Sequence, residues 1–150
     1  MISDRRRILV IANETVEGNV LHETIRFNAS EARTVEVLVI APALNSRVRH
    51  WISDEDEARR RAELRLAACI DRLAAAGIEA IGWVGDANPL QAIQDALHFF
   101  AADVIIIATH PEGRSHWLAR NVVGRARLRF PQTIRHVVVD VGRGQEVAAA

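Results

Sequence analysis

Residues 101–109, Ala-Ala-Asp-Val-Ile-Ile-Ile-Ala-Thr, hold the strongest structural signal in this chain. The segment 104–108 is an uninterrupted apolar run rich in β-branched side chains, and Thr109 follows it. Such a run predicts a strand that is buried on both faces, as strands are in parallel sheets. The segment that follows Thr109 is therefore expected to lie at the carboxyl end of a buried strand.

Four other apolar segments have the same character and alternate with helical patterns. The resulting order βαβαβαβαβ predicts an α/β fold with a five-stranded parallel sheet, right-handed crossovers and helices on both faces. The other strands are predicted at 7–12 (RILVIA), 35–41 (VEVLVIA), 78–84 (IEAIGWV) and 134–141 (IRHVVVDV), and the helices at 19–30, 53–76, 89–101 and 115–130.

The helix ends carry recognisable capping signals. Ser53 is a candidate N-cap residue for the longest helix, and Gly77 is suited to terminate that helix as a residue in the left-handed conformation. Asn88 is predicted to cap the third helix, with Pro89 at its first position. Asp86 precedes this cap, so a turn role competes with contact to a ribose hydroxyl.

The length of 150 residues indicates one domain, which we assign to residues 1–140. The tail 141–150 is predicted to be frayed. Cys69 is the single cysteine and falls on the expected apolar face of a helix, so it is predicted to fill the core. The apolar run near the N-terminus is too short for a secretion signal or a membrane span, which gives a cytoplasmic location as the default expectation.

The basic residues are unusual because all 19 are arginine. The absence of lysine excludes the lysine-containing phosphate loop and Schiff-base chemistry. The 19 acidic residues bring the net charge to zero, so general attraction to nucleic acid or to an anionic membrane is not expected. Known catalytic motifs are also missing, and we therefore predict binding rather than catalysis.

The loop after the fourth strand is the strongest candidate for a ligand site. Residues 109–117 contain Gly113 and lead into a predicted helix, and exposed backbone N–H groups at such a turn can bind an anion. Six arginines and no acidic residue lie between Gly113 and Val139. They indicate either a phosphate site or a solvated basic helix face. The nearby His110, Glu112 and His116 could ligate a metal, but we predict none.

Three segments resemble the universal stress protein (UspA-like) family: 7–13 (RILVIAN), 84–93 (VGDANPLQAI) and 101–109 (AADVIIIAT). The likeness extends over nearly the whole chain. It implies an α/β/α Rossmann-like sandwich with sheet order 3-2-1-4-5, a homodimer and a stress-related role. For one branch of the family it also implies ATP or AMP at the ends of strands one and four.

The nucleotide motif of that branch, G-x2-G-x9-G-[ST], is altered in this sequence. Ala108 stands near the first glycine, and Gly113 matches the second with four intervening residues instead of two. Gly124 follows after ten residues instead of nine, and Arg125 replaces the serine or threonine. Gly124 is equally explained as a helix interruption.

Two other positions follow from the resemblance alone. Asn13 stands where binding members carry an aspartate, and Val39 occupies the second-strand position near the adenine. The predicted nucleotide site therefore consists of Asn13, Val39, Thr109, Gly113, Arg114, Gly124 and Arg125.

Two functions remain open at this point, and a third has less support. The first is a non-catalytic regulatory protein that binds an adenine nucleotide. The second is a dimer of this family that acts through protein contacts, with Trp51, Trp117 and the arginine-rich segment at the interface. Hydrolase or transferase activity lacks an assembled acid–base set. The homodimer is predicted through the fifth strand, 134–140, because this strand would otherwise be an unpaired apolar edge.

Overall fold

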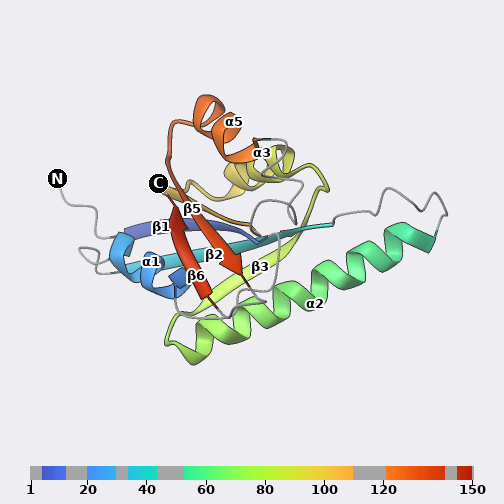
Figure 1. Cartoon of the computed structure of the whole chain (residues 1–150), viewed down its shortest axis with the longest axis horizontal. Coiled ribbons are helices and arrows are strands. Elements are labelled where there is room, and N and C mark those ends of the chain that lie inside the picture. The colour runs from blue at the N-terminus through green and yellow to red at the C-terminus, as the bar shows by residue number, and fades with distance from the viewer. Residues whose placement is uncertain are drawn as a thin grey trace.

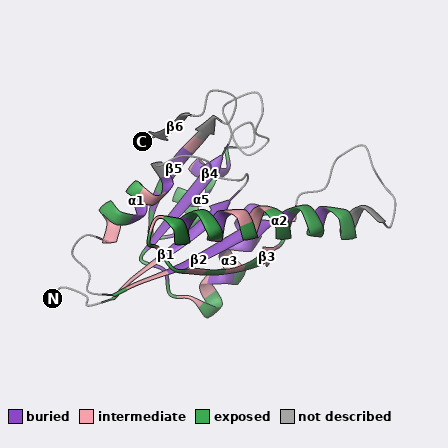
Figure 2. Ribbon diagram, turned by 90° about the horizontal axis from the view of Figure 1, so that it is seen from below, coloured by how far each residue is buried: buried purple, intermediate pink, exposed green. Residues whose placement is uncertain are grey.

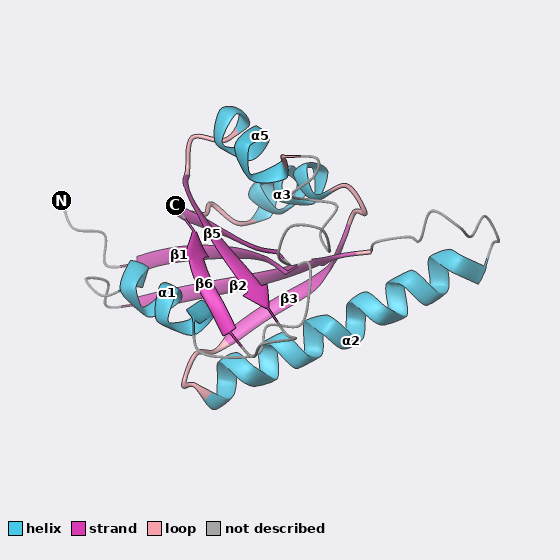
Figure 3. Cartoon of the chain, in the orientation of Figure 1, coloured by secondary structure: helices cyan, strands magenta, loops and turns pink. Residues whose placement is uncertain are grey.

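The computed structural model describes residues 5–12, 20–29, 34–43, 53–109, 121–140 and 145–149. In these residues, helices and strands alternate and build one sheet between two layers of helices (Figures 1 and 3). The strands are β1 (Arg5–Ala12), β2 (Thr34–Pro42), β3 (Ala80–Gly85), β4 (Val104–Thr109), β5 (Thr133–Asp140) and β6 (Gln145–Ala149). The helices are α1 (Val20–Ala29), α2 (Ser53–Ala75), α3 (Pro89–Phe99) and α5 (Val122–Arg129).

The sheet order is β3-β2-β1-β4-β5-β6. The first five strands in this order pair in parallel, which confirms the predicted five-stranded sheet of order 3-2-1-4-5. β1 and β4 lie at the centre, with Ile8 opposite Val104 and Ala12 opposite Ala108. Every residue of β4 is buried, as expected for its continuous apolar sequence (Figure 2).

Each face of the sheet has its own apolar core. On one face Ile8 and Val10 belong to a cluster that includes Leu21 of α1 and Cys69 of α2. On the other face, Leu9 and Ile11 belong to a cluster with side chains of α3 and α5. Because adjacent residues of a strand point to opposite faces, a fully apolar strand supplies both cores. The prediction that Cys69 fills the core is confirmed.

Two described helix ends agree with the capping signals, whereas Ser53, the predicted N-cap, is the first helical residue of α2. Gly77 has a φ of +83° just after α2, which is the left-handed conformation expected of a terminating glycine. Asn88 Oδ1 accepts a hydrogen bond from the backbone N–H of Leu90 at 3.0 Å, at the start of α3. Asp86 Oδ1 accepts one from the N–H of Asn88 at 2.8 Å, which is the predicted turn role.

The C-terminal segment corrects the prediction of a frayed tail. Residues Gln145–Ala149 form β6, which pairs antiparallel with β5 from Asp140 back to His136. The sequence of β6 is too rich in alanine to signal a strand. It becomes one because it satisfies backbone N–H and C=O groups along the outer side of β5.

This pairing removes the argument for a dimer through β5. β6 pairs with residues 136–140, which make up most of the stretch 134–140 that the sequence left as an apolar edge. The two ends of the described sheet are instead β3 and β6.

The helical segment predicted at 115–130 is also corrected. α5 starts at Val122, and Asn121 before it has a φ of 52°. This left-handed conformation cannot occur inside a continuous α-helix. A single helix from 115 to 130 is therefore excluded, and the residues before Asn121 lie outside the described part of the chain.

Candidate functional site

The candidate site lies where β1 and β4 end side by side. Ala12 pairs with Ala108, and Thr109 is the last residue of β4. The chain progresses from β1 toward β2 and β3 on one side and from β4 toward β5 on the other. In open α/β sheets this reversal of order leaves a crevice at the carboxyl ends of the two central strands, where ligands bind.

Three of the predicted site residues, Asn13, Gly113 and Arg114, lie outside the described residues. So do the interface candidates Trp51 and Trp117, and the three candidate metal ligands His110, Glu112 and His116. Within the described segments, no cluster of three or more His, Cys, Asp or Glu side chains is arranged to hold a metal ion.

Thr109 is buried and its hydroxyl already has a partner. Thr109 Oγ1 lies 2.7 Å from Nε2 of His136, which comes from the neighbouring strand β5. Both side chains are buried, and they are the two buried polar side chains of the described core. In this conformation the Thr109 hydroxyl faces the protein interior, so its side chain does not present a free ligand group at the crevice.

His136 has an environment that disfavours its charged form. Burial lowers the pKa of the imidazole below its ordinary value of 6.5, and the nearby positive charge of Arg127 lowers it further. The guanidinium of Arg127 lies against β5, because its Nη2 donates to the carbonyl oxygen of Ile134 at 3.4 Å. His136 is therefore neutral near pH 7.

Val39 contributes to the core in the structure. It has no solvent exposure and belongs to the same cluster as Val10 and Cys69. Its side chain offers no surface to a ring in this conformation, so its predicted contact with adenine stays a prediction.

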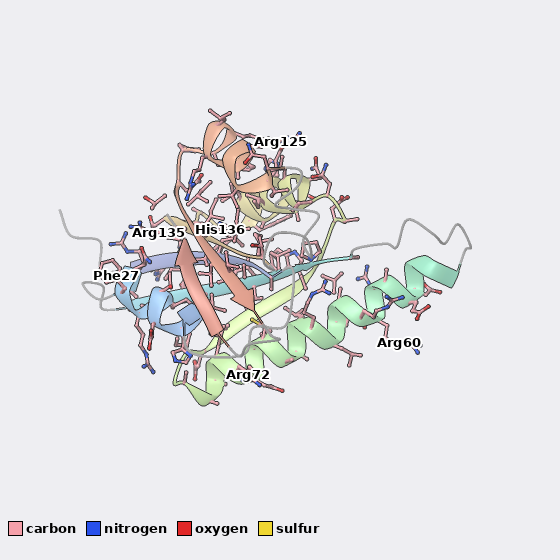
Figure 4. All side chains as sticks on the ribbon, viewed as in Figure 1. Phe27, Arg60, Arg72, Arg125, Arg135 and His136 are labelled. Atoms are coloured by element: carbon pink, nitrogen blue, oxygen red, sulfur yellow. The ribbon has the colours of Figure 1, made fainter. Side chains whose placement is uncertain are left out.

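Gly124 and Arg125 lie in the first turn of α5. The backbone N–H of Arg125 donates to the carbonyl oxygen of Asn121 at 3.0 Å, which closes the first turn of the helix. The N–H groups of Val122, Val123 and Gly124 precede this bond, and such groups have no acceptor within a helix. Arg125 is exposed and extends from this end of α5 (Figure 4). The first turn of α5 thus combines backbone donors with a permanent positive charge.

Arg65 is a cation near the carboxyl edge of the sheet that the sequence did not indicate as a candidate. It extends from α2 to the end of β2, where its Nη2 donates to the carbonyl oxygen of Pro42 at 2.7 Å. In the sequence it belongs to a helix with many exposed arginines, and helical spacing alone does not mark it. Only the packing of α2 across the sheet shows that this partly buried cation lies at the carboxyl edge of β2.

A cavity of about 400 Å³ lies at the opposite edge of the sheet. It lies between α1 and the connection from α2 to β3, and its walls include Ile25, Arg26, Val35 and Ile78. This cavity adjoins the amino ends of β2 and β3, so it is separate from the crevice at the switch point.

None of the described helices is long and apolar enough to cross a membrane.

Comparison with known proteins identifies the fold. No family model and no curated protein matches the chain. Solved structures do match it. A universal stress protein from Archaeoglobus fulgidus has a TM-score of 0.57 at 20% identity, over 87% of this chain and 92% of that chain. A universal stress protein family protein from Arabidopsis thaliana, crystallised with AMP bound, has a TM-score of 0.56 at 8% identity. That match covers 92% of this chain and 94% of the other.

These likenesses show that the chain has the fold of universal stress proteins. They confirm the α/β/α architecture that the resemblance in the sequence implied.

Proposed function

We propose that this chain is a regulatory protein of the universal stress protein type that binds an adenine nucleotide, ATP or AMP, without catalysing a reaction. The nucleotide is placed at the carboxyl ends of β1 and β4. The observation that carries the proposal is the position of these ends, which lie next to each other at the point where the strand order reverses. The AMP in the Arabidopsis thaliana structure of the same fold supports the choice of nucleotide.

The described residues fit the phosphate part of such a ligand. The first turn of α5 offers backbone N–H groups, and Gly124 has no side chain of its own, so that the exposed side chain of Asn121 lies against it. Arg125 adds an exposed cationic side chain that can donate two hydrogen bonds to a phosphate. Arg65 provides a second cation at the end of β2, on the α2 face of the sheet, which is the face opposite to α5.

The buried pair of Thr109 and His136 supports binding rather than catalysis. A hydroxyl at 2.7 Å from an imidazole has the geometry of a nucleophile and its base. However, Thr109 has no solvent exposure, so a substrate cannot reach the hydroxyl. The chain has no lysine, so arginine is its basic side chain besides histidine. Arginine does not readily give up its proton at neutral pH and is therefore a poor acid–base catalyst.

Calorimetric titration with ATP and with AMP tests the proposal. We expect saturable binding of one nucleotide per chain. Arg125→Ala should weaken the binding, because the substitution removes a cation at the first turn of α5. Arg60→Ala is the matched control, because Arg60 is an exposed arginine on α2 (Figure 4). If the parent protein shows no heat of binding at millimolar nucleotide, the proposal is wrong. If Arg125→Ala binds as tightly as the parent, Arg125 is not part of the site.

A dimer that acts through protein contacts is the second candidate, and the edge strand β3 favours it. Ile81 and Trp83 point to the same face of this strand and are 68% and 39% exposed. An edge strand with exposed apolar side chains is a typical surface for pairing with another chain. Sedimentation of the parent and of Trp83→Arg distinguishes this candidate: a dimer that becomes a monomer in the variant supports it, and a monomeric parent excludes it.

A further inference from the structure

The hydrogen bond between His136 and Thr109 joins two strands beside the proposed nucleotide site, and a charged side chain of α5 acts on the same imidazole. Thr109 ends β4, His136 lies in the middle of β5, and Arg127 of α5 lies close enough to affect the imidazole. His136 pairs in register with Ile107, so its ring extends two residues along the sheet toward the carboxyl edge. The imidazole therefore reaches the point where the main chain leaves β4.

We propose that His136 is a positioning residue of the nucleotide site, which fixes the end of β4 by holding the hydroxyl of Thr109. The inference rests on the proposed function and adds a residue that touches no nucleotide itself. Its basis is the 2.7 Å distance between two buried polar atoms on neighbouring strands.

The Thr109 side chain can transmit this constraint to its own main chain. A β-branched residue has few allowed χ1 rotamers, and a hydrogen bond from its hydroxyl selects one of them. Because the hydroxyl is buried, it loses its hydrogen-bond partner when His136 is removed. Thr109 could then adopt another rotamer, and the last residue of β4 would lose the side-chain contact that fixes it to β5.

The second connection of His136 leads to α5. Arg127 lies on the same helix as Gly124 and Arg125, and its guanidinium is held at Ile134 of β5. Among the described residues, Arg127 is the charged group that acts on His136, and Thr109 is its hydrogen-bonded partner. His136 thus contacts the end of β4 and is coupled electrostatically to the helix whose first turn is proposed to bind phosphate.

Four variants test the inference by ATP affinity. Thr109→Val removes the hydroxyl with nearly the same shape, and His136→Ala removes the ring. Thr109→Ser keeps a hydroxyl, and His136→Gln places an amide near the position of Nε2. Arg135→Ala is the control, since Arg135 is an exposed neighbour of His136 on the same strand (Figure 4).

We expect Thr109→Val and His136→Ala each to weaken ATP binding about three- to tenfold, the range of one lost hydrogen bond. The double variant should be no weaker than either single variant, because the two residues act through one bond. Thr109→Ser, His136→Gln and Arg135→Ala should bind within about twofold of the parent. The ¹⁵N signals of the His136 imidazole should also shift when ATP is added.

A purely structural role gives a different result. Thr109→Val would then lower stability but leave the affinity of the folded protein unchanged, and ATP would not move the imidazole signals. That outcome overturns the inference while the proposed function stands. If His136→Ala does not fold, Thr109→Val and His136→Gln still decide the question. If the parent protein itself does not bind ATP or AMP, the proposed function and the inference both fail.

Discussion

The side-chain amide of Asn121 occupies the space that a side chain on Gly124 would need. A Cβ atom at Gly124 would lie 2.5 Å from Oδ1 and 2.7 Å from Nδ2 of Asn121. Asn121 is exposed, is in the left-handed conformation and makes no side-chain capping bond to α5. The missing side chain at Gly124 therefore leaves the first turn of α5 open to a polar group, which in this structure is the amide of Asn121.

Replacing Gly124 by alanine separates the structural from the functional explanation of this glycine. The φ of Gly124 is not positive, and the clashing atoms are the end of an exposed side chain that can rotate away. Alanine is favoured over glycine in a helix by about 1 kcal/mol, so we expect Gly124→Ala to raise the free energy of unfolding by up to that amount. At the same time ATP affinity should fall, because a methyl group would stand where phosphate approaches. Denaturant unfolding and calorimetry measure the two effects; unchanged affinity would show that Gly124 only interrupts the helix.

Gly77→Ala is the matched control for that substitution. Gly77 has a φ of +83° and its surroundings are open, with Arg26 Nη2 at 4.0 Å from a Cβ placed there. A methyl group at this position meets no steric clash, so the effect of the substitution comes from the backbone conformation alone. We expect Gly77→Ala to lower the free energy of unfolding by about 1–2 kcal/mol. ATP affinity should not change, since Gly77 lies after α2 beside the cavity at the amino ends of the strands. Stability equal to that of the parent in urea unfolding would contradict the φ of this residue.

The stability of the protein should depend on pH through His136. Burial and Arg127 lower the pKa of His136 in the folded state, whereas the unfolded value stays near 6.5. Between these two values the unfolded state binds more protons, so the free energy of unfolding increases with pH. The contribution is fully present above pH 6.5 and is lost as the pH falls through the folded pKa. Urea unfolding from pH 5 to 8 measures this slope.

The variant His136→Gln tests whether His136 causes the pH dependence of the free energy of unfolding. Glutamine keeps a neutral hydrogen-bonding group for Thr109 and does not titrate. We expect the free energy of unfolding of this variant to change less with pH below 6.5 than that of the parent. Parallel curves for the two proteins would show that other groups cause the pH dependence.

Removing the C-terminal segment should expose the outer side of β5. Truncation after Asp140 deletes β6 and leaves the backbone of residues 136–140 without its antiparallel partner. Unpaired edge strands of apolar sequence tend to pair with each other, so we expect the truncated chain to self-associate more strongly than the full chain. Sedimentation velocity over a range of concentrations compares the two. Equal association states would mean that β6 does not cover the edge in solution.

The positions of the strands and most helix ends were accessible from the sequence because they depend on local patterns, whereas the order of the strands in the sheet came from the resemblance to a known family. Five apolar runs specify buried strands, and Asn88 and Gly77 cap helices through their own side chain or conformation. β6 was missed because its sequence has little strand propensity and it pairs only where β5 leaves a free edge. The apolar runs and the capping residues can be recognised from neighbouring positions in the sequence. β6, in contrast, forms through its contact with a strand that is distant from its own sequence signals.

The site was predicted less completely, for the same physical reason. Arg125 and Gly124 were found through a motif and lie together in the first turn of α5. The contact between Thr109 and His136 spans 27 positions, and Arg65 reaches Pro42 across 23. Both depend on how neighbouring elements pack, and no spacing in the sequence indicates either. Sequence reasoning placed His136 inside an element but could not assign it a partner.

Native mass spectrometry tests the central claim most directly, namely that the ends of β1 and β4 hold an adenine nucleotide. The purified protein is measured alone and after addition of AMP or ATP, with Arg60→Ala and Arg125→Ala measured in parallel. We predict a mass increase of one nucleotide per chain for the parent and for Arg60→Ala, and a smaller bound fraction for Arg125→Ala. A parent protein that shows no bound nucleotide at millimolar AMP or ATP would contradict the claim.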